Sequence, residues 1–288
     1  MNFNHPTAKP VVLCADDYGI APGVGRGIRA LAAAGRLSAT SCMTVFAEWC
    51  DEASRLADAT DRIDVGLHLT LTDHAPLGAM PRLAPGGRLP ALGRLIRLAH
   101  LRQLNRDEVA GEIARQLDAF EAVVGRPPAF VDGHQHVHVL PVVRDAVLAL
   151  FDGRLDRRRT WLRSCAEPPG RILRRRVDAA RALAVSTLAG PLHRDAIRTG
   201  IAGNRGFAGV TSFRPGRSVA ADFAAYLDHT GPRPLVMCHP GEPDDMLAGR
   251  DPVVGQRAAE LAFLAGDGFA ALVESRRMVL ARGPAGSA

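Results

Sequence analysis

Lysine is almost absent from this 288-residue chain, and aromatic residues are scarce. Lys9 is the only lysine among 36 basic residues, so the net charge of +6 and the pI near 9.6 rest on arginine. The densest basic runs, 156–163 and 171–181, are candidate phosphate-binding patches, but the second has no interleaved aromatic residues to stack bases. A solvated helix face or loop is the more ordinary interpretation, and we expect no nucleic-acid partner.

Long apolar runs and a disulfide framework are also missing. No uncharged run reaches the roughly 18 residues expected of a membrane-spanning helix, and the N-terminal MNFNHPTAKP lacks the regions of a signal peptide. The five cysteines are odd in number and irregularly spaced. We therefore expect a cytoplasmic protein with no stable membrane insertion.

What the chain does contain is an alternation of strand and helix patterns. Hydrophobic residues make up 47% and charged residues 23%, as in ordinary globular proteins. Strands are expected at VVLCA (11–15), SATSCMTVF, DVGLHLTLT, PAFVDGHQHVHVL, TWLRS, FAGVTSF, PLVMCH and around FAALVES. Such alternation implies a mostly parallel sheet, and seven or eight units at this length predict a β/α barrel of the TIM type.

One domain is expected over residues 1–288, with its core at about 10–275. The segment 73–106 is rich in Pro and Gly and long enough to overhang a site, so it is a lid, a substrate loop or a surface excursion. The following RDEVAGEIARQLDAFEAVVG has apolar residues at helical spacing. It predicts an amphipathic helix packed on the barrel.

Polar residues stand at the ends of several expected strands, where catalytic groups gather in a parallel barrel. They are Asp16, Asp17, His68, the cluster at 132–138, Arg163 and His239. Any one of them has an ordinary structural explanation: a helix cap for the aspartates, a hydrogen-bonded histidine for His68, or a structural role before Pro240 for His239. Their combination predicts a metal site, because two histidines and a carboxylate are a common open catalytic set.

The stretch FVDGHQHVH repeats a polar residue at every second position. A strand would place Asp132, His134, His136 and His138 on one face. The strand spacing of about 6.6–6.8 Å between alternate residues exceeds the separation of neighbouring ligands. We therefore expect one or two of the histidines to bind metal and the others to orient ligands or contact substrate.

Two adjacent carboxylates point in different directions from an extended backbone. One can bind a metal ion that acidifies water while the other takes the proton, which is machinery for hydrolysing an amide or ester. His239, at the end of a late strand, is a suitable proton donor to the leaving amine.

Four motifs resemble, in type and order, those of the YdjC-like carbohydrate deacetylase family, which includes the chitooligosaccharide deacetylases. They are LCADDYG, VGLHLTLT, VDGHQHVHVLP and VMCHPG, and the resemblance runs over roughly residues 10–275. It implies a distorted (β/α) TIM-like barrel and metal-dependent removal of acetyl from an N-acetylated amino sugar.

The resemblance also implies roles for single residues. Asp17, His68 and His134 would hold one divalent metal ion, Asp16 would be the general base, His239 would protonate the amine, and Arg163 would bias the charge of Asp16. The remaining candidates for supporting or substrate contacts are Asp132, His136, His138 and Tyr18. The family's ion is described as magnesium, whereas two imidazoles favour zinc, so its identity stays open.

Other functions compete with this hypothesis. A metal-dependent phosphoesterase would have a second ion about 3.5–4 Å from the first. A glycosidase fits less well, since its two carboxyls must face each other across a bond. A non-catalytic sugar or metal sensor would keep its activity in Asp16→Asn. The expected partner is a small N-acetylated sugar, and a homodimer is expected from general frequency alone.

Overall fold

The computed structural model describes residues 8–214 and 216–283. Within these ranges eight strands lie in one sheet: β1 (Lys9–Tyr18), β2 (Ala39–Cys42), β3 (Asp64–Leu69), β4 (Phe130–Gly133), β5 (Trp161–Leu162), β6 (Phe207–Ala208), β7 (Leu235–Cys238) and β8 (Met278–Leu280).

Helices follow most of the strands. The α-helices are α1 (Pro22–Ala33), α2 (Trp49–Leu56), α3 (Leu92–His100), α4 (Arg106–Val124), α5 (Val143–Gly153), α6 (Pro169–Arg175), α7 (Ala179–Arg198), α8 (Val219–Asp228), α9 (Asp245–Arg250), α10 (Gly255–Ala265) and α11 (Asp267–Ser275). Two 3-10 segments are η1 (Ala57–Ala59) and η2 (His134–Val139).

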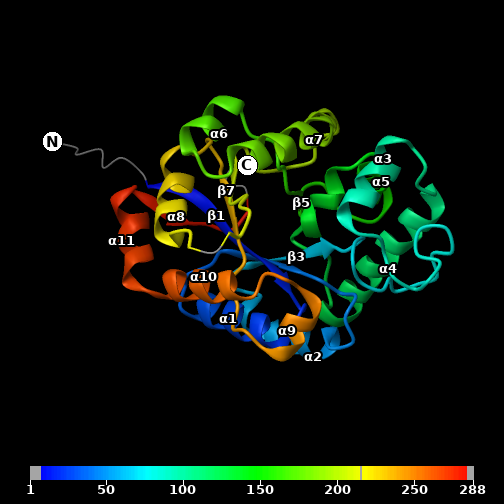
Figure 1. The fold of residues 1–288 in the computed structure, drawn as a ribbon, viewed down its shortest axis with the longest axis horizontal. Helices are drawn as coiled ribbons and strands as arrows, with labels where there is room; N and C mark the ends of the chain where they lie inside the picture. Colours follow the sequence, from blue (N-terminus) through cyan, green and yellow to red (C-terminus); the bar gives the residue numbers. More distant parts are fainter. Residues whose placement is uncertain (1–7, 215, 284–288) are drawn as a thin grey trace.

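The paired strands are all parallel, in the order β5-β4-β3-β2-β1-β7-β6, and β8 pairs with the beginning of β1. A further parallel bridge joins Leu162 to Gly203, so the segment that leads into β6 also contacts β5 and brings the two edges of the sheet together. Figure 1 shows β1 crossing the middle of the molecule, between α1 and α10 on one side and α6 and α7 on the other. The predicted distorted α/β barrel is confirmed.

Local sequence explains the helix that packs beside β3. Asn105 caps α4 by accepting a hydrogen bond from the backbone N–H of Glu108, and Gly125 ends it in the left-handed region. Val109, Ile113 and Phe120 are fully buried on its inner face. The amphipathic helix predicted from apolar spacing is confirmed.

The strand expected around FAALVES is wrong. These residues lie in α11, and a strand follows only at Met278–Leu280. Phe269, Leu272 and Val273 recur at helical spacing, and Phe269 is buried against Phe263 and Phe223. An apolar run of this length fits either element, and the aromatic packing favours the helix.

The single domain expected over 1–288 stays a prediction, and its two ends, 1–7 and 284–288, lie outside the described residues. Within the ranges that the structure describes, no helix combines the length and apolar character needed to cross a bilayer.

Candidate active site

The carboxyl end of β1 carries a bulge that brings two consecutive aspartates into the site. β1 is in regular register with β2 up to Ala15 and resumes at Tyr18, with one residue more than its partner strand. Asp17 has a φ of 68°, a backbone conformation that residues other than glycine adopt only at a cost in conformational energy. Asp16 and Asp17 are 2% and 1% exposed, so the bulge places both carboxylates inside the protein at the end of the strand.

Gly19 completes this turn. Its φ is 93°, and a Cβ at this position would lie 2.7 Å from the carbonyl oxygen of Met43. Only glycine fits such a backbone, so the turn after the two aspartates depends on the glycine of the ADDYG motif.

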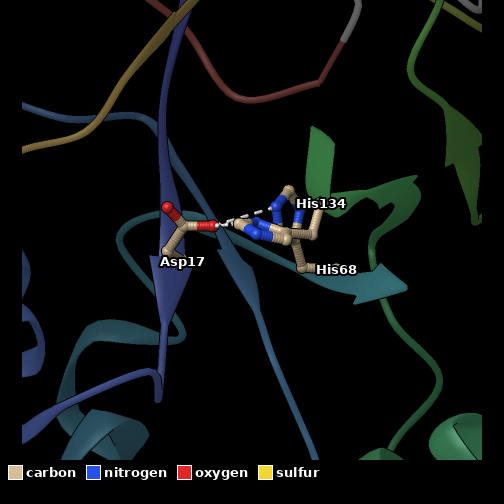
Figure 2. A group of neighbouring side chains, drawn as sticks. All are labelled: Asp17, His68 and His134. Atoms are coloured by element: carbon tan, nitrogen blue, oxygen red, sulfur yellow. Dashed lines mark hydrogen bonds and ion pairs between the residues drawn. The ribbon is translucent and has the colours of Figure 1, made fainter. Parts of the chain in front are cut away.

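Three side chains, those of Asp17, His68 and His134, converge as a candidate metal centre, which we call the metal group. Oδ1 of Asp17 lies 3.2 Å from Nε2 of His68 and 2.9 Å from Nδ1 of His134. One ligand atom from each of the three lies within 4.8 Å of the others. Figure 2 shows the two imidazoles turned toward the same carboxylate oxygen from β3 and from the segment after β4. A carboxylate and two imidazoles of this kind suit a divalent transition ion.

His68 is held from its other side. Its Nδ1 lies 2.7 Å from Oδ1 of Asp132, and Ser41 hydrogen-bonds to the same carboxylate. Burial disfavours the charged ring, yet the Asp132 carboxylate outweighs burial and raises the pKa of His68 to about 10 in the metal-free protein. Asp132 therefore orients the ring and leaves Nε2 facing Asp17, as the outer carboxylate of a metal-bound histidine does.

Asp16 has a different partner from Asp17. The guanidinium of Arg163 contacts both Asp16 oxygens at 2.6 Å, and its Nη2 is also 2.6 Å from Oδ2 of Asp132. Although burial favours the neutral carboxyl, Arg163 holds the pKa of Asp16 below its usual range. Asp16 is therefore a carboxylate at neutral pH, fixed in orientation by a bidentate contact.

A second group of metal-ligating residue types lies behind Asp16. Cys14, Asp16 and Asp132 have ligand atoms within 4.8 Å of one another. Arg163 already lies among them, with Nη2 3.0 Å from the Cys14 sulfur, and burial raises the pKa of the Cys14 thiol well above its usual value. This second group therefore already holds a cation, the guanidinium.

Arg257 is a site residue that sequence analysis missed. Its Nη2 lies 2.6 Å from Oδ2 of Asp17 and 2.5 Å from Oδ2 of Asp251, and the side chain is 1% exposed. Although burial favours the protonated acid, Arg257 and then His134 hold the pKa of Asp17 well below its usual range. Arg257 lies outside the motifs and the basic runs that the sequence singles out.

The two aspartates open into a cavity of about 370 Å³, large enough for a small ligand. His68, His134, His136, His239 and Arg257 line it together with them. One wall is apolar and comes from α3 and α7: Leu92, Ile96, Ala184, Val185 and Leu188. The predicted 73–106 insertion thus contributes α3 to the cavity wall, which favours the lid or substrate-loop interpretation of this segment.

His239 lies in the same cavity just beyond β7. Its backbone N–H donates to the Glu260 carboxylate at 2.6 Å, and its ring packs edge-on to Phe213 at 5.0 Å. Burial lowers the pKa of His239, so the ring is neutral at neutral pH in the substrate-free protein. Burial also raises the pKa of Glu260 to about 7.

The prediction that the 132–138 cluster lies on one face of a strand is wrong. β4 ends at Gly133, and η2 follows with left-handed backbone at Gln135 and His136 (φ 52° and 62°). His136 still lines the cavity, whereas His138 is fully buried, with Nε2 3.2 Å from the carbonyl oxygen of Arg163. The broken period separates the histidines, and of the three only His134 belongs to the metal group.

Tyr18 was a candidate for supporting or substrate contacts, and the structure places its ring away from the cavity. The bulge turns its ring into the core, where it is fully buried. Its hydroxyl donates to the carbonyl oxygen of Glu52 at 2.6 Å and accepts from Arg29 at 2.7 Å. Tyr18 therefore anchors α2 to the end of β1, and it is not among the residues that line the cavity.

The model of the YdjC-like protein family matches residues 10–275. The chain belongs to the YdjC-like family. Two curated relatives are named chitooligosaccharide deacetylase: that of Yersinia enterocolitica is 38% identical over 136 residues, covering 47% of this chain and 53% of the relative. That of Serratia marcescens is 34% identical over 164 residues, covering 55% and 64%. The alignments thus span less than two thirds of either relative.

A solved structure from Enterococcus faecalis, named as a candidate cellobiose-phosphate cleavage protein, has the same fold as this YdjC-like chain. The superposition has a TM-score of 0.73 and covers 96% of this chain and 98% of the other, at 19% identity. This likeness supports the fold over almost the whole chain.

Proposed function

We propose that this YdjC-like protein is a metal-dependent carbohydrate deacetylase that hydrolyses the acetamide of an N-acetylated amino sugar. The observation that carries the proposal is the convergence of Asp17, His68 and His134 beside a second, arginine-held carboxylate, Asp16, at one cavity. The names of the two curated relatives support the same activity.

The donor set fits a divalent ion. Oδ1 of Asp17 and one nitrogen from each of His68 and His134 face one another, and Asp132 orients His68 from behind. When bound, such an ion polarises a carbonyl oxygen and acidifies water. Two imidazoles with one carboxylate suit zinc or another transition ion better than magnesium, and we propose zinc as the preferred ion.

Asp16 is the proposed general base. It lines the cavity next to the metal group, and Arg163 keeps it ionised and fixed in orientation. In the reaction Asp16 accepts the proton of the water that attacks the acetyl carbonyl. Positioning by Arg163 offsets the low basicity that the same ion pair imposes.

His239 is the proposed proton donor to the leaving amine. Its ring is neutral before the reaction because burial lowers its pKa. Negative charge that develops on the attacked carbonyl beside it raises that pKa during the reaction, so the ring can take up the proton that Asp16 accepted from water and pass it to the amine nitrogen. The hydrogen bond from its backbone N–H to Glu260 fixes its position.

The proposed compartment is the cytoplasm. All five cysteines are unpaired, and four of them are buried. Free buried thiols are typical of proteins that fold in a reducing environment.

Acetate release tests the function directly. Metal-free, zinc-loaded and magnesium-loaded protein would be assayed with N-acetylated mono-, oligo- and lipid-linked sugars, with His134→Ala as control. We expect metal-dependent acetate from the wild type and none above background from the variant. Metal binding without acetate from any sugar would contradict the proposal.

A two-metal phosphoesterase has weaker support. Its second ion would need a second set of ligands close to the first, and the second acidic group among the described residues already surrounds the Arg163 guanidinium. Release of phosphate from sugar phosphates, measured in the same samples, distinguishes this alternative.

A further inference from the structure

The two oxygens of Asp17 face different partners. Oδ1 faces the two imidazoles, with 2.9 Å to His134 and 3.2 Å to His68. Oδ2 is 2.6 Å from Nη2 of Arg257 on the opposite side. Only one oxygen of this carboxylate is therefore directed to the metal group.

Arg257 is itself held firmly. Its Nη2 also contacts Asp251 at 2.5 Å, and its Nε donates to the carbonyl oxygen of Val253 at 3.0 Å. The side chain is 1% exposed, and α10 begins only two residues earlier. A buried guanidinium with three fixed contacts cannot rotate away without leaving charges unpaired, so its position is determined by the fold.

The same helix reaches the proposed proton donor. Glu260, three residues after Arg257 and so on the same side of α10, accepts the backbone N–H of His239. One helix thus contacts the end of β1 through Arg257 and the end of β7 through Glu260.

We propose that Arg257 is a positioning residue that restricts Asp17 to one ligand oxygen. By engaging Oδ2, it prevents the carboxylate from binding an ion through both oxygens, and it keeps one coordination position open for water or substrate. The inference rests on the metal site of the proposed function, and it adds a residue that would act on the metal through Asp17.

The alternative is an ordinary buried ion pair that stabilises the barrel and has no influence on coordination. Arg175 provides the comparison. It is also a buried arginine, paired with Glu167 at 3.1 Å and bonded to the backbone of Phe207, and it is absent from the lining of the cavity. Substitution of either arginine should lower the stability of the fold, but only substitution of Arg257 should change the coordination of the metal.

The test uses Co²⁺ as the probe, because the visible absorption of Co²⁺ is stronger in four-coordinate than in five- or six-coordinate sites. Wild type, Arg257→Met, Arg257→Lys and Arg175→Met would be loaded with Co²⁺ and compared. We expect weaker absorption in Arg257→Met, because Asp17 is then free to bind through both oxygens, with recovery in Arg257→Lys and the wild-type spectrum in Arg175→Met.

Turnover gives the second readout. Contacts that orient ligands typically contribute about 10- to 100-fold to affinity or activity, and we expect a loss of this size in kcat for Arg257→Met with little change in KM. A wild-type spectrum and wild-type kcat in Arg257→Met would overturn the proposal. Should Arg257→Met not fold, Arg257→Lys combined with Asp251→Asn weakens the same contact, and an unchanged spectrum there overturns it equally.

The outcomes separate this inference from the proposed function. A Co²⁺ spectrum that responds to Arg257 in a protein releasing no acetate supports the positioning role and contradicts the deacetylase. Acetate release that is unchanged by substitution of Arg257, together with an unchanged Co²⁺ spectrum, supports the deacetylase and contradicts the positioning role. No Co²⁺ binding by the wild type would overturn both.

Discussion

Asp16 and Asp17 are neighbours in the chain, yet their carboxylates contact different partners in the site. Arg163 engages both oxygens of Asp16, whereas Arg257 engages a single oxygen of Asp17 and leaves the other to the histidines. The roles proposed for these consecutive carboxylates differ because an arginine occupies both oxygens of Asp16 and a single oxygen of Asp17. A carboxylate bound at both oxygens keeps its charge and orientation, and one bound at a single oxygen can also be a ligand.

The largest expected effect comes from removing each negative charge in turn. Asp16→Asn should keep the metal and lose turnover by about 10²- to 10⁴-fold, the usual contribution of a general base. Asp17→Asn should lose metal affinity by more than the roughly 100-fold typical of an outer contact, because a ligand itself is removed. Titration calorimetry and acetate release on both variants check this. Equal metal affinities in the two variants would erase the proposed difference.

A second experiment removes the cation on the Asp16 side. Arg163→Met leaves Asp16 buried without its guanidinium partner and leaves Asp132 with His68 alone, so we expect a loss of about 3–5 kcal/mol in the free energy of unfolding. Urea denaturation measures it. Arg276→Met, which removes an exposed ion pair with Asp228, should lower the free energy of unfolding far less and serves as control. Similar losses in both variants would count against a buried charge network.

The Arg257 side contributes a pH effect through Glu260. Its folded pKa of about 7 lies above the ordinary value near 4.5 because of burial. Between these values the folded protein keeps a proton that the unfolded chain has lost, so this contribution to stability is complete below about pH 4.5 and declines as pH rises to 7. The free energy of unfolding of Glu260→Gln should therefore rise relative to that of the wild type by up to about 3 kcal/mol between pH 5 and 8. Parallel pH profiles of unfolding free energy would contradict this.

The smallest change in the metal site is expected for His138. Its ring contacts the backbone of Arg163 and the sulfur of Cys165 and lies outside the metal group. His138→Asn should lower stability by about 1–3 kcal/mol through an unsatisfied buried partner. Its Co²⁺ spectrum and metal affinity should match the wild type, in contrast to His134→Ala. A loss of metal in His138→Asn would show that the two histidines are not separated as described.

The barrel and the positions at its strand ends were predictable because parallel strands place their carboxyl ends at one edge. Asp16, Asp17, His68 and Arg163 each follow or end an apolar run, and the structure brings them together. Their neighbourhood follows from the topology alone, whatever the exact backbone at each position.

Backbone detail and long-range contacts were not predictable. The left-handed residues Gln135 and His136 break the strand period, and neither is a glycine or proline that would mark the change. The bulge before Tyr18 likewise reverses the face on which that ring lies. Arg257 lies 240 residues from its partner Asp17, and nothing nearby distinguishes it among 36 basic residues.

β1 is the first strand to be synthesised, but it pairs with β7 and β8, the last two strands in the sequence. The three proposed ligand residues lie in the first half of the chain, whereas Arg163, His239 and Arg257 are synthesised later. Contacts between such distant segments form slowly during folding. A partly synthesised chain would thus expose aspartates and histidines before the barrel exists to arrange them. We therefore expect the ion to enter a folded barrel and not to nucleate one.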